Sequence, residues 1–311
     1  ILFILFVIFA GERFYSKEVY SYGGSQSITG IGGYILTLLI ISIIMLTFTV
    51  IYNLRFKTKN NFLITLFFSS PFYVLLSSSY ILLFLFVGDR GTALQLISVF
   101  ILCYAYFINK IYIFKFLSIL ISGAFVLTVI GFYRGIVDSN IEINTFYDLT
   151  INLANSARTL YLGISNIIEG GEIYYGKLWI GNILGIIPFA QNIFIEISGY
   201  PIHMLNTANY ITYLRYGLNP HTGEGSTVII DLFMNWGKTG VVIFMFLFGI
   251  FFRKINDEFI YGKNINWLIV GSLVGAVSFY IGRANIFTPV KMILWGLIIS
   301  KFLLNKKYLF K

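Results

Sequence analysis

The chain has 311 residues, of which 58% are hydrophobic and only 11% are charged. A soluble domain carries roughly 25% charged residues, so this composition excludes a soluble globular protein and indicates a protein that lies in lipid. The net charge of +9 does not indicate nucleic-acid binding, because the basic residues lie in short clusters between apolar runs. The single cysteine, Cys103, lies inside an apolar run, which excludes a disulfide framework.

Apolar runs long enough to cross a membrane follow one another along the chain. A spanning helix needs about 20 mostly apolar residues, and about seven runs satisfy this: residues 34–52, 62–87, 94–108, 116–133, 228–252, 265–281 and 286–304. Pro71 interrupts the second run, where we expect a kink. Residues 1–10 are too short, and because the sequence begins without a Met we expect them to be the outer half of a truncated span.

A long segment of mixed character, residues 134–227, separates these runs. Its two apolar stretches, residues 178–189 and 194–202, are too short to span a membrane and contain Pro188 and Pro201. We expect short interfacial helices here, forming a lid or binding element. The sequence thus predicts an all-α, polytopic transmembrane bundle in three parts: N-terminal spans over residues 1–133, a large extracytoplasmic loop over residues 134–227, and C-terminal spans over residues 228–311.

The distribution of Lys and Arg predicts the orientation of the bundle. Twelve of these residues lie at one set of span ends and four at the opposite set. Basic residues favour the cytoplasmic side, so we expect the larger set to be cytoplasmic and the loop over residues 134–227 to lie outside. The larger set is Arg55, Lys57, Lys59, Lys110, Lys115, Arg253, Lys254, Lys263, Lys301, Lys306, Lys307 and Lys311, and the smaller set is Arg13, Lys17, Arg90 and Arg283.

Three arginines at the predicted outer membrane face are the strongest candidates for binding a substrate. Arg90 lies in GDRG at 88–91, Arg134 in GFYRG at 131–135, and Arg283 in GRAN at 282–285. A guanidinium group matches a phosphate with two parallel hydrogen bonds, and flanking glycines let a ligand approach the backbone. We predict that the three bind one diphosphate, with Arg215 assisting; alternatively, each pairs with a nearby acid such as Asp89 or reaches lipid headgroups.

A second group of candidates ends the long loop, in the sequence NPHTGEGST at 219–227. His221 or Glu224 could act as a base that deprotonates an acceptor hydroxyl, or could orient it, and Asp231 is a third candidate catalytic residue. We expect Ser226 or Thr227 to cap the next helix and Asp231 to lie one turn inside it, facing the bundle. The alternative is that His221 packs a loop turn and Asp231 is a buried hydrogen-bonding group.

Motifs of soluble enzymes are absent from the sequence. It contains no P-loop, no HExxH and no CxxC. With two histidines and one cysteine, we expect neither a metal site nor a cofactor.

Several of these features together resemble the Wzy-type bacterial polymerases of O-antigen and capsule repeat units. The resemblance covers most of residues 62–311 and consists of GDRG before a span, the large outer loop, the stretch from Ser226 through Asp231 to WGKTG at 236–240, and Arg283 before a last span with a basic tail. It implies a metal-independent, GT-C-like glycosyltransferase in the bacterial inner membrane, with its active site facing the periplasm or cell exterior. Donor and acceptor would both be oligosaccharides linked to undecaprenyl diphosphate, and a chain-length regulator would be a possible partner.

Two other functions stay open at this point. The related O-antigen ligases also carry arginines and a histidine in the equivalent loop, although the local pattern here is not a close ligase match. A transporter or flippase of lipid-linked oligosaccharide should show internal repeats and charged residues near mid-membrane, whereas the candidates here lie at one membrane face and no repeat is visible.

Overall fold

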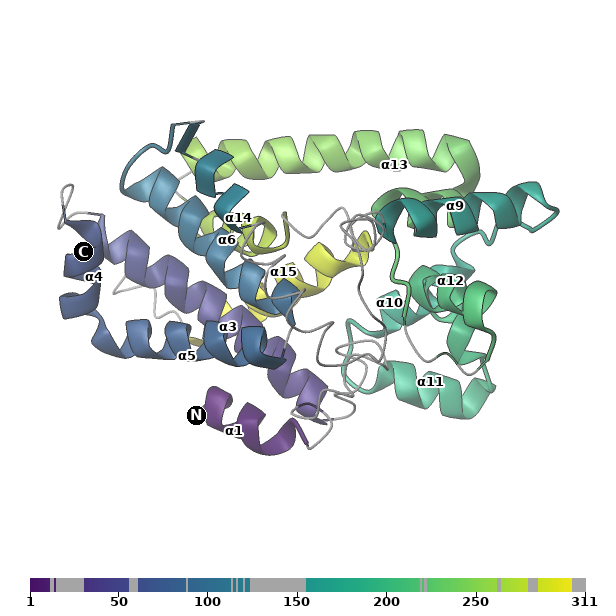
Figure 1. Cartoon of the computed structure of the whole chain (residues 1–311), viewed down its shortest axis with the longest axis horizontal. Helices are drawn as coiled ribbons and strands as arrows, with labels where there is room; N and C mark the ends of the chain where they lie inside the picture. Colours follow the sequence, from purple (N-terminus) through teal and green to yellow (C-terminus); the bar gives the residue numbers. More distant parts are fainter. Residues whose placement is uncertain are drawn as a thin grey trace, which may run out of the picture.

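A computed structural model of the chain shows a helical protein (Figure 1). In the residues that it describes, all regular secondary structure is helical, which confirms the predicted all-α class. The described residues are 1–11, 14, 31–55, 61–87, 89–112, 114–115, 117–119, 121–123, 155–218, 220, 223–261, 264–278 and 285–303.

Four apolar helices pack together in a group that we call the bundle. They are α3 (Ile31–Leu54), α6 (Arg90–Phe107), α14 (Ile265–Ser278) and α15 (Phe287–Leu303). Helix α14 contacts α3, α6, α15 and the second part of α13 (Val228–Tyr261). Its glycines allow a close approach, because a Cβ atom at Gly271 would lie 2.2 Å from the Phe259 ring and one at Gly275 would lie 3.0 Å from Leu102. Small residues at such positions let apolar helices approach closely, as membrane helices do.

The predicted kink at Pro71 is a sharp break between two helices. Helix α4 (Phe62–Ser69) and helix α5 (Pro71–Val87) meet at 102°. Proline is tolerated at the first position of a helix, where its missing N–H has no intrahelical partner. Helix α1 (Leu2–Phe9) packs beside them, since the Phe6 ring stacks on Phe84 with centroids 5.6 Å apart.

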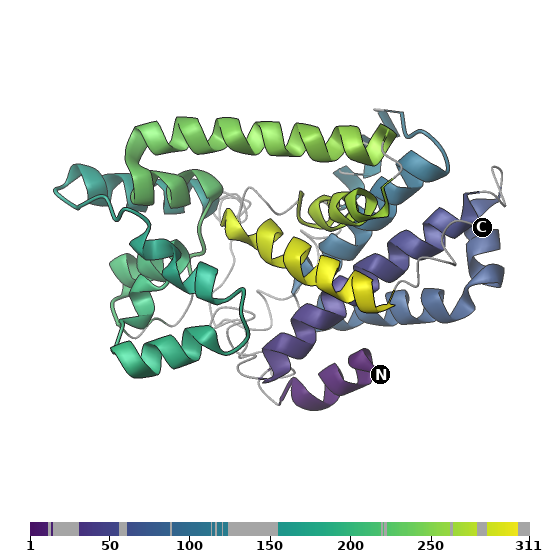
Figure 2. The ribbon, with the colours of Figure 1, turned by 180° about the vertical axis from the view of Figure 1, so that it is seen from behind.

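The helix after the long loop, α13 (Val228–Tyr261), begins at the predicted residue but is broken at Gly237. Gly237 has φ 67° and ψ −166°, a conformation that only glycine adopts readily. Residues 228–236 therefore pack beside helix α9 (Asn155–Ile168), and the remainder runs along the bundle (Figures 1 and 2).

Two described helices, α3 and α13, are long and apolar enough to cross a membrane, and α4 with α5 would make a third if the bent pair is one span. The predicted runs 94–108, 265–281 and 286–304 appear as helices α6, α14 and α15, so helix formation is confirmed there. The run 116–133 lies mostly outside the described residues. The prediction of about seven spans stays a prediction.

Short helices form a second body, which we call the small-helix unit. Its core contains Leu178, Ile211, Ile230 and Met234. The prediction of short helices around Pro188 and Pro201 is confirmed, while their position relative to a membrane stays a prediction. The elements are α9, η3 (Lys177–Trp179), α10 (Ile180–Leu184), α11 (Ala190–Ser198), η4 (Ile202–Met204), α12 (Thr207–Tyr216) and the first part of α13.

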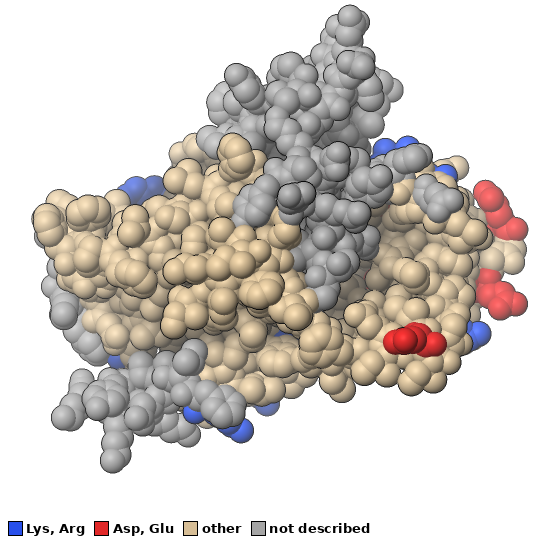
Figure 3. All heavy atoms as spheres, turned by 90° about the horizontal axis from the view of Figure 1, so that it is seen from below, with Lys and Arg blue, Asp and Glu red and all other residues tan. Residues whose placement is uncertain are grey.

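Acidic side chains gather at one end of the face in Figure 3, whereas basic side chains occur at both ends. On the face in Figure 3, the acidic side chains lie at the end occupied by the small-helix unit, and most of the remaining described surface is uncharged. The second part of α13 exposes large apolar side chains, including Val242 at 71% and Phe246 at 69% exposure. A surface of this kind matches a lipid environment better than water.

Candidate functional site

Glu224 is the centre of the most highly charged cluster among the described residues. Its side chain is only 1% exposed and accepts hydrogen bonds from two arginines. Nε and Nη2 of Arg158 lie 3.0 and 2.7 Å from Oε2, and Nη1 of Arg215 lies 2.5 Å from Oε1. The two guanidinium groups are therefore held side by side by one buried carboxylate.

The rest of the Glu224 environment fixes the carboxylate in place. The Tyr216 hydroxyl donates to Oε1 at 2.8 Å, and the Glu224 backbone N–H donates to Thr212 Oγ1 at 3.1 Å. Burial and the hydrogen bond to Glu224 raise the pKa of the Tyr216 phenol, so this phenol keeps its proton and acts as a donor. Four side-chain N–H and O–H donors therefore converge on this one buried carboxylate.

Among the described residues, Glu224 does not use all the hydrogen-bond donors of either arginine in this cluster, and no other described acceptor takes the rest. The Arg158 and Arg215 side chains are 35% and 33% exposed. A guanidinium group has five N–H donors, and Glu224 takes two from Arg158 and one from Arg215. The Glu224 charge neutralises only one of the two arginines, so the cluster keeps a net positive charge and donors for an anion.

Asp231 forms a separate buried network at the start of α13. Its carboxylate accepts hydrogen bonds from the Thr207 hydroxyl and from Trp179 Nε1, the latter at 3.1 Å. Asn235, one turn later, donates to the Asp231 carbonyl at 2.8 Å and accepts from the Leu178 N–H at 3.2 Å. Asp231 and Asn235 are fully buried, so this network joins η3 and α12 to α13 rather than facing a substrate.

The predicted start of this helix is confirmed. Thr227 Oγ1 accepts a hydrogen bond from the Ile230 N–H at 3.2 Å, which is the N-cap contact expected of Ser226 or Thr227. Asp231 lies one turn inside the helix and faces the interior, as predicted. The two acids thus lie on either side of the cap, with Glu224 before it and Asp231 after it.

The structure brings together two of the predicted site residues, Glu224 and Arg215. His221, Arg134 and Arg283 lie outside the described residues. Arg90 begins α6, whose N-cap Asp89 accepts from the N–H and the hydroxyl of Thr92 at 3.1 and 2.6 Å, but the Arg90 side chain is not among those described. The shared diphosphate site therefore stays a prediction.

No sequence motif indicates Arg158 as a site residue. Arg158 lies 66 residues before Glu224 and has no flanking glycine, so no local signal marks it. His203, which stacks on Tyr213 with ring centroids 4.1 Å apart, has a packing role. Within the described residues, no three His, Cys, Asp or Glu side chains gather as metal ligands would.

No protein-family model, no curated protein and no solved structure matches this chain.

Proposed function

We propose that this chain is a membrane glycosyltransferase that joins oligosaccharide repeat units carried on undecaprenyl diphosphate. The observation that supports this most directly is the pair of arginines, Arg158 and Arg215, held by the buried Glu224. The resemblance to Wzy-type polymerases supports the reaction class, and the arginine pair supports a diphosphate as the group that leaves.

The proposed reaction needs positive charge where the diphosphate leaves. The acceptor hydroxyl attacks the anomeric carbon of the donor sugar, a new C–O bond forms, and the bond between that carbon and the diphosphate oxygen breaks. The electron pair goes to the diphosphate and the hydroxyl proton goes to a base. Guanidinium donors already fixed before the reaction stabilise the developing charge without reorganisation.

In this proposal Glu224 is a positioning residue. Its two oxygens already accept hydrogen bonds from Arg158, Arg215 and Tyr216, so both oxygens are used to hold the cluster together. His221, three residues earlier in the chain, is the proposed base. Asp231 has a supporting role, because it joins η3 and α12 to the first part of α13.

The remaining parts of the proposal concern the membrane. We infer a GT-C-like bundle in the bacterial inner membrane, with the small-helix unit outside, its short helices at the interface, and a chain-length regulator as a possible partner. The asymmetry of twelve to four basic residues and the apolar surface of α13 support this arrangement. Arg90, Arg134 and Arg283 would supply further donors to the diphosphate.

The test uses purified protein in liposomes with its lipid-linked repeat unit, and compares Arg158→Lys, Arg215→Lys and Arg253→Lys. Lys keeps the charge but loses the planar fork, so the first two should lose about 100-fold to 1000-fold in rate, equivalent to about 3–4 kcal/mol. Arg253 is the control, since it is 85% exposed and, among the described residues, forms one ion pair, with Asp257 at 3.8 Å.

The products separate the possible functions. A ladder of lengthened glycans identifies a polymerase, a single transfer to another acceptor identifies a ligase, and movement between leaflets without a new glycosidic bond identifies a transporter. Normal ladders from Arg158→Lys and Arg215→Lys, at normal protein level, would remove this cluster from the active site. The same assay with Arg283→Lys tests the predicted clamp separately.

A further inference from the structure

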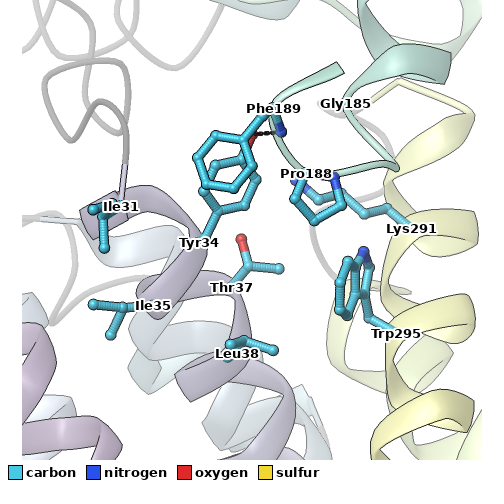
Figure 4. A pocket seen from close by; sticks show the side chains of 10 residues that line it. All are labelled: Ile31, Tyr34, Ile35, Thr37, Leu38, Gly185, Pro188, Phe189, Lys291 and Trp295. Atoms are coloured by element: carbon cyan, nitrogen blue, oxygen red, sulfur yellow. Dashed lines mark hydrogen bonds between the residues drawn. The ribbon is translucent and has the colours of Figure 1, made fainter. Parts of the chain in front are cut away.

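An apolar pocket lies where the small-helix unit meets the bundle (Figure 4). It has a volume of about 220 Å³ and is bounded by the first half of α3, the turn between α10 and α11, and α15. Its walls include Ile35 and Leu38 on α3, Pro188 in the turn, and Trp295 on α15. Among the lining residues, all of which the structure describes, there is no acid.

Hydrogen bonds hold the turn against both neighbouring helices. The Phe189 N–H donates to the Tyr34 hydroxyl at 2.6 Å, and the two rings pack with centroids 4.7 Å apart. On the other side, Trp295 Nε1 donates to the Ile186 carbonyl at 2.9 Å. These contacts use the polar atoms of Tyr34 and Trp295 and leave apolar surfaces toward the cavity.

Lys291 is the only charged residue that lines the pocket. Figure 4 shows its side chain reaching from α15 toward Pro188 and the turn. Among the described residues it has no ion-pair or hydrogen-bond partner, although it is half-buried. An unpaired ammonium group beside apolar walls is costly, so this geometry favours a ligand that brings a negative charge and an apolar chain together.

The position of Lys291 along α15 narrows the choice of ligand. It lies four residues after Phe287, which begins the helix, and so about 6 Å from that end at about 1.5 Å per residue. In the predicted topology the beginnings of α3 and α15 are both at the outer face. A cation at that depth is close to the phosphate groups of lipids in the outer leaflet.

We propose that this pocket binds the phosphate-bearing end of a lipid, with Lys291 neutralising the phosphate and the apolar walls holding the first part of the chain. A polyprenyl phosphate and an anionic phospholipid both present this chemistry. The proposal requires no glycosyl transfer, so it can stand if the proposed reaction is wrong.

The experiment measures binding of a radiolabelled polyprenyl phosphate to the full chain in nanodiscs of zwitterionic lipid. Lys291→Met removes the charge and keeps the side-chain length, and should weaken binding at least tenfold. Lys291→Arg should retain most of the affinity. Lys301→Met is the control, because Lys301 is exposed in the last turn of the same helix.

Competition identifies the source of the ligand. Equal displacement by phosphatidylglycerol would support a general site for lipid phosphates, and weak displacement would support one selective for the polyprenyl chain. Equal binding by the parent and Lys291→Met, or displacement by inorganic phosphate at the lipid's own concentration, would overturn the proposal. If Lys291→Met fails to fold, the unsubstituted protein is labelled instead with a photoreactive polyprenyl phosphate. The proposal expects labelling at residues 31–38, 185–189 or 291–295, and labelling elsewhere overturns it.

Discussion

Replacing Glu224 with Gln isolates the charge that holds the two arginines together. The amide has nearly the same shape, but one of its two terminal atoms becomes an NH2 donor. That donor must face either Arg158 or the pair Arg215 and Tyr216, all of which are donors themselves. One side of the cluster therefore loses its hydrogen bonds whichever way the amide is oriented.

The free energy lost on Glu224→Gln depends on how deeply the carboxylate is buried and on how many hydrogen bonds it accepts. Hydrogen bonds to charged groups contribute about 1.5–3 kcal/mol, and breaking a fully buried ion pair costs about 3–5 kcal/mol. Because the two arginines are 35% and 33% exposed, they can turn toward water after the change, which lowers the cost. We expect the contact between α9 and the Glu224 turn to weaken by about 2–3 kcal/mol.

Hydrogen exchange measured by mass spectrometry checks whether the contact between α9 and the Glu224 turn is weakened. In the regime where exchange reports the opening equilibrium, a loss of about 2–3 kcal/mol speeds exchange about 30-fold to 150-fold in peptides that cover residues 155–162. Glu196→Gln is the control, since Glu196 is exposed on α11 in the same unit. Equal exchange of residues 155–162 in the two variants would refute the argument that Glu224 holds this unit together.

Three further predictions concern the fold and topology. Asp231→Asn should cost about 1 kcal/mol in thermal unfolding, because the amide can still accept from Trp179 Nε1 and donate to the Thr207 hydroxyl. Asp231→Leu should cost about 2 kcal/mol more, because Leu offers neither contact and leaves the buried Trp179 N–H without an acceptor; equal effects would contradict this. Gly237→Ala should destabilise the protein by about 1–3 kcal/mol in thermal unfolding, because Gly237 has φ 67°. Gly249→Ala is the control and should not destabilise it, because no heavy atom lies within 4 Å of the added Cβ. Asn155→Cys should react with an impermeant thiol reagent in intact cells, while buried Cys103 should not; reaction at position 155 only after inner-membrane lysis would reverse the predicted topology.

Properties that depend on composition and on neighbouring residues could be predicted from the sequence. The membrane class follows from 58% hydrophobic residues, and the structure has two described helices long and apolar enough to cross a membrane. The break at Pro71 and the cap at Thr227 were also predictable, because both effects act within one helical turn. Proline lacks the N–H that a helix interior needs, and the Thr227 hydroxyl accepts from the N–H three residues later.

The pairing of distant groups could not be predicted in the same way. Arg215 was assigned to the diphosphate on its chemistry alone, and only the tertiary structure shows that Glu224 holds it beside Arg158. No periodicity relates Arg158 to a carboxylate 66 residues later, since their contact depends on how α9 packs against α12 and α13.

The tertiary structure also decided where apolar segments end and what they enclose. From the sequence, Gly237 lies inside one continuous apolar span. In the structure it adopts φ 67° beside Ile173 and breaks the helix. A local sequence pattern cannot specify this contact, because Ile173 is far away in the chain. Lys291 likewise looks like one charge in an apolar helix, and becomes a candidate lipid contact only when α3 and the turn at Pro188 close a pocket around it. Helix formation depends on neighbouring residues, whereas a site depends on which surfaces the packed helices bring together.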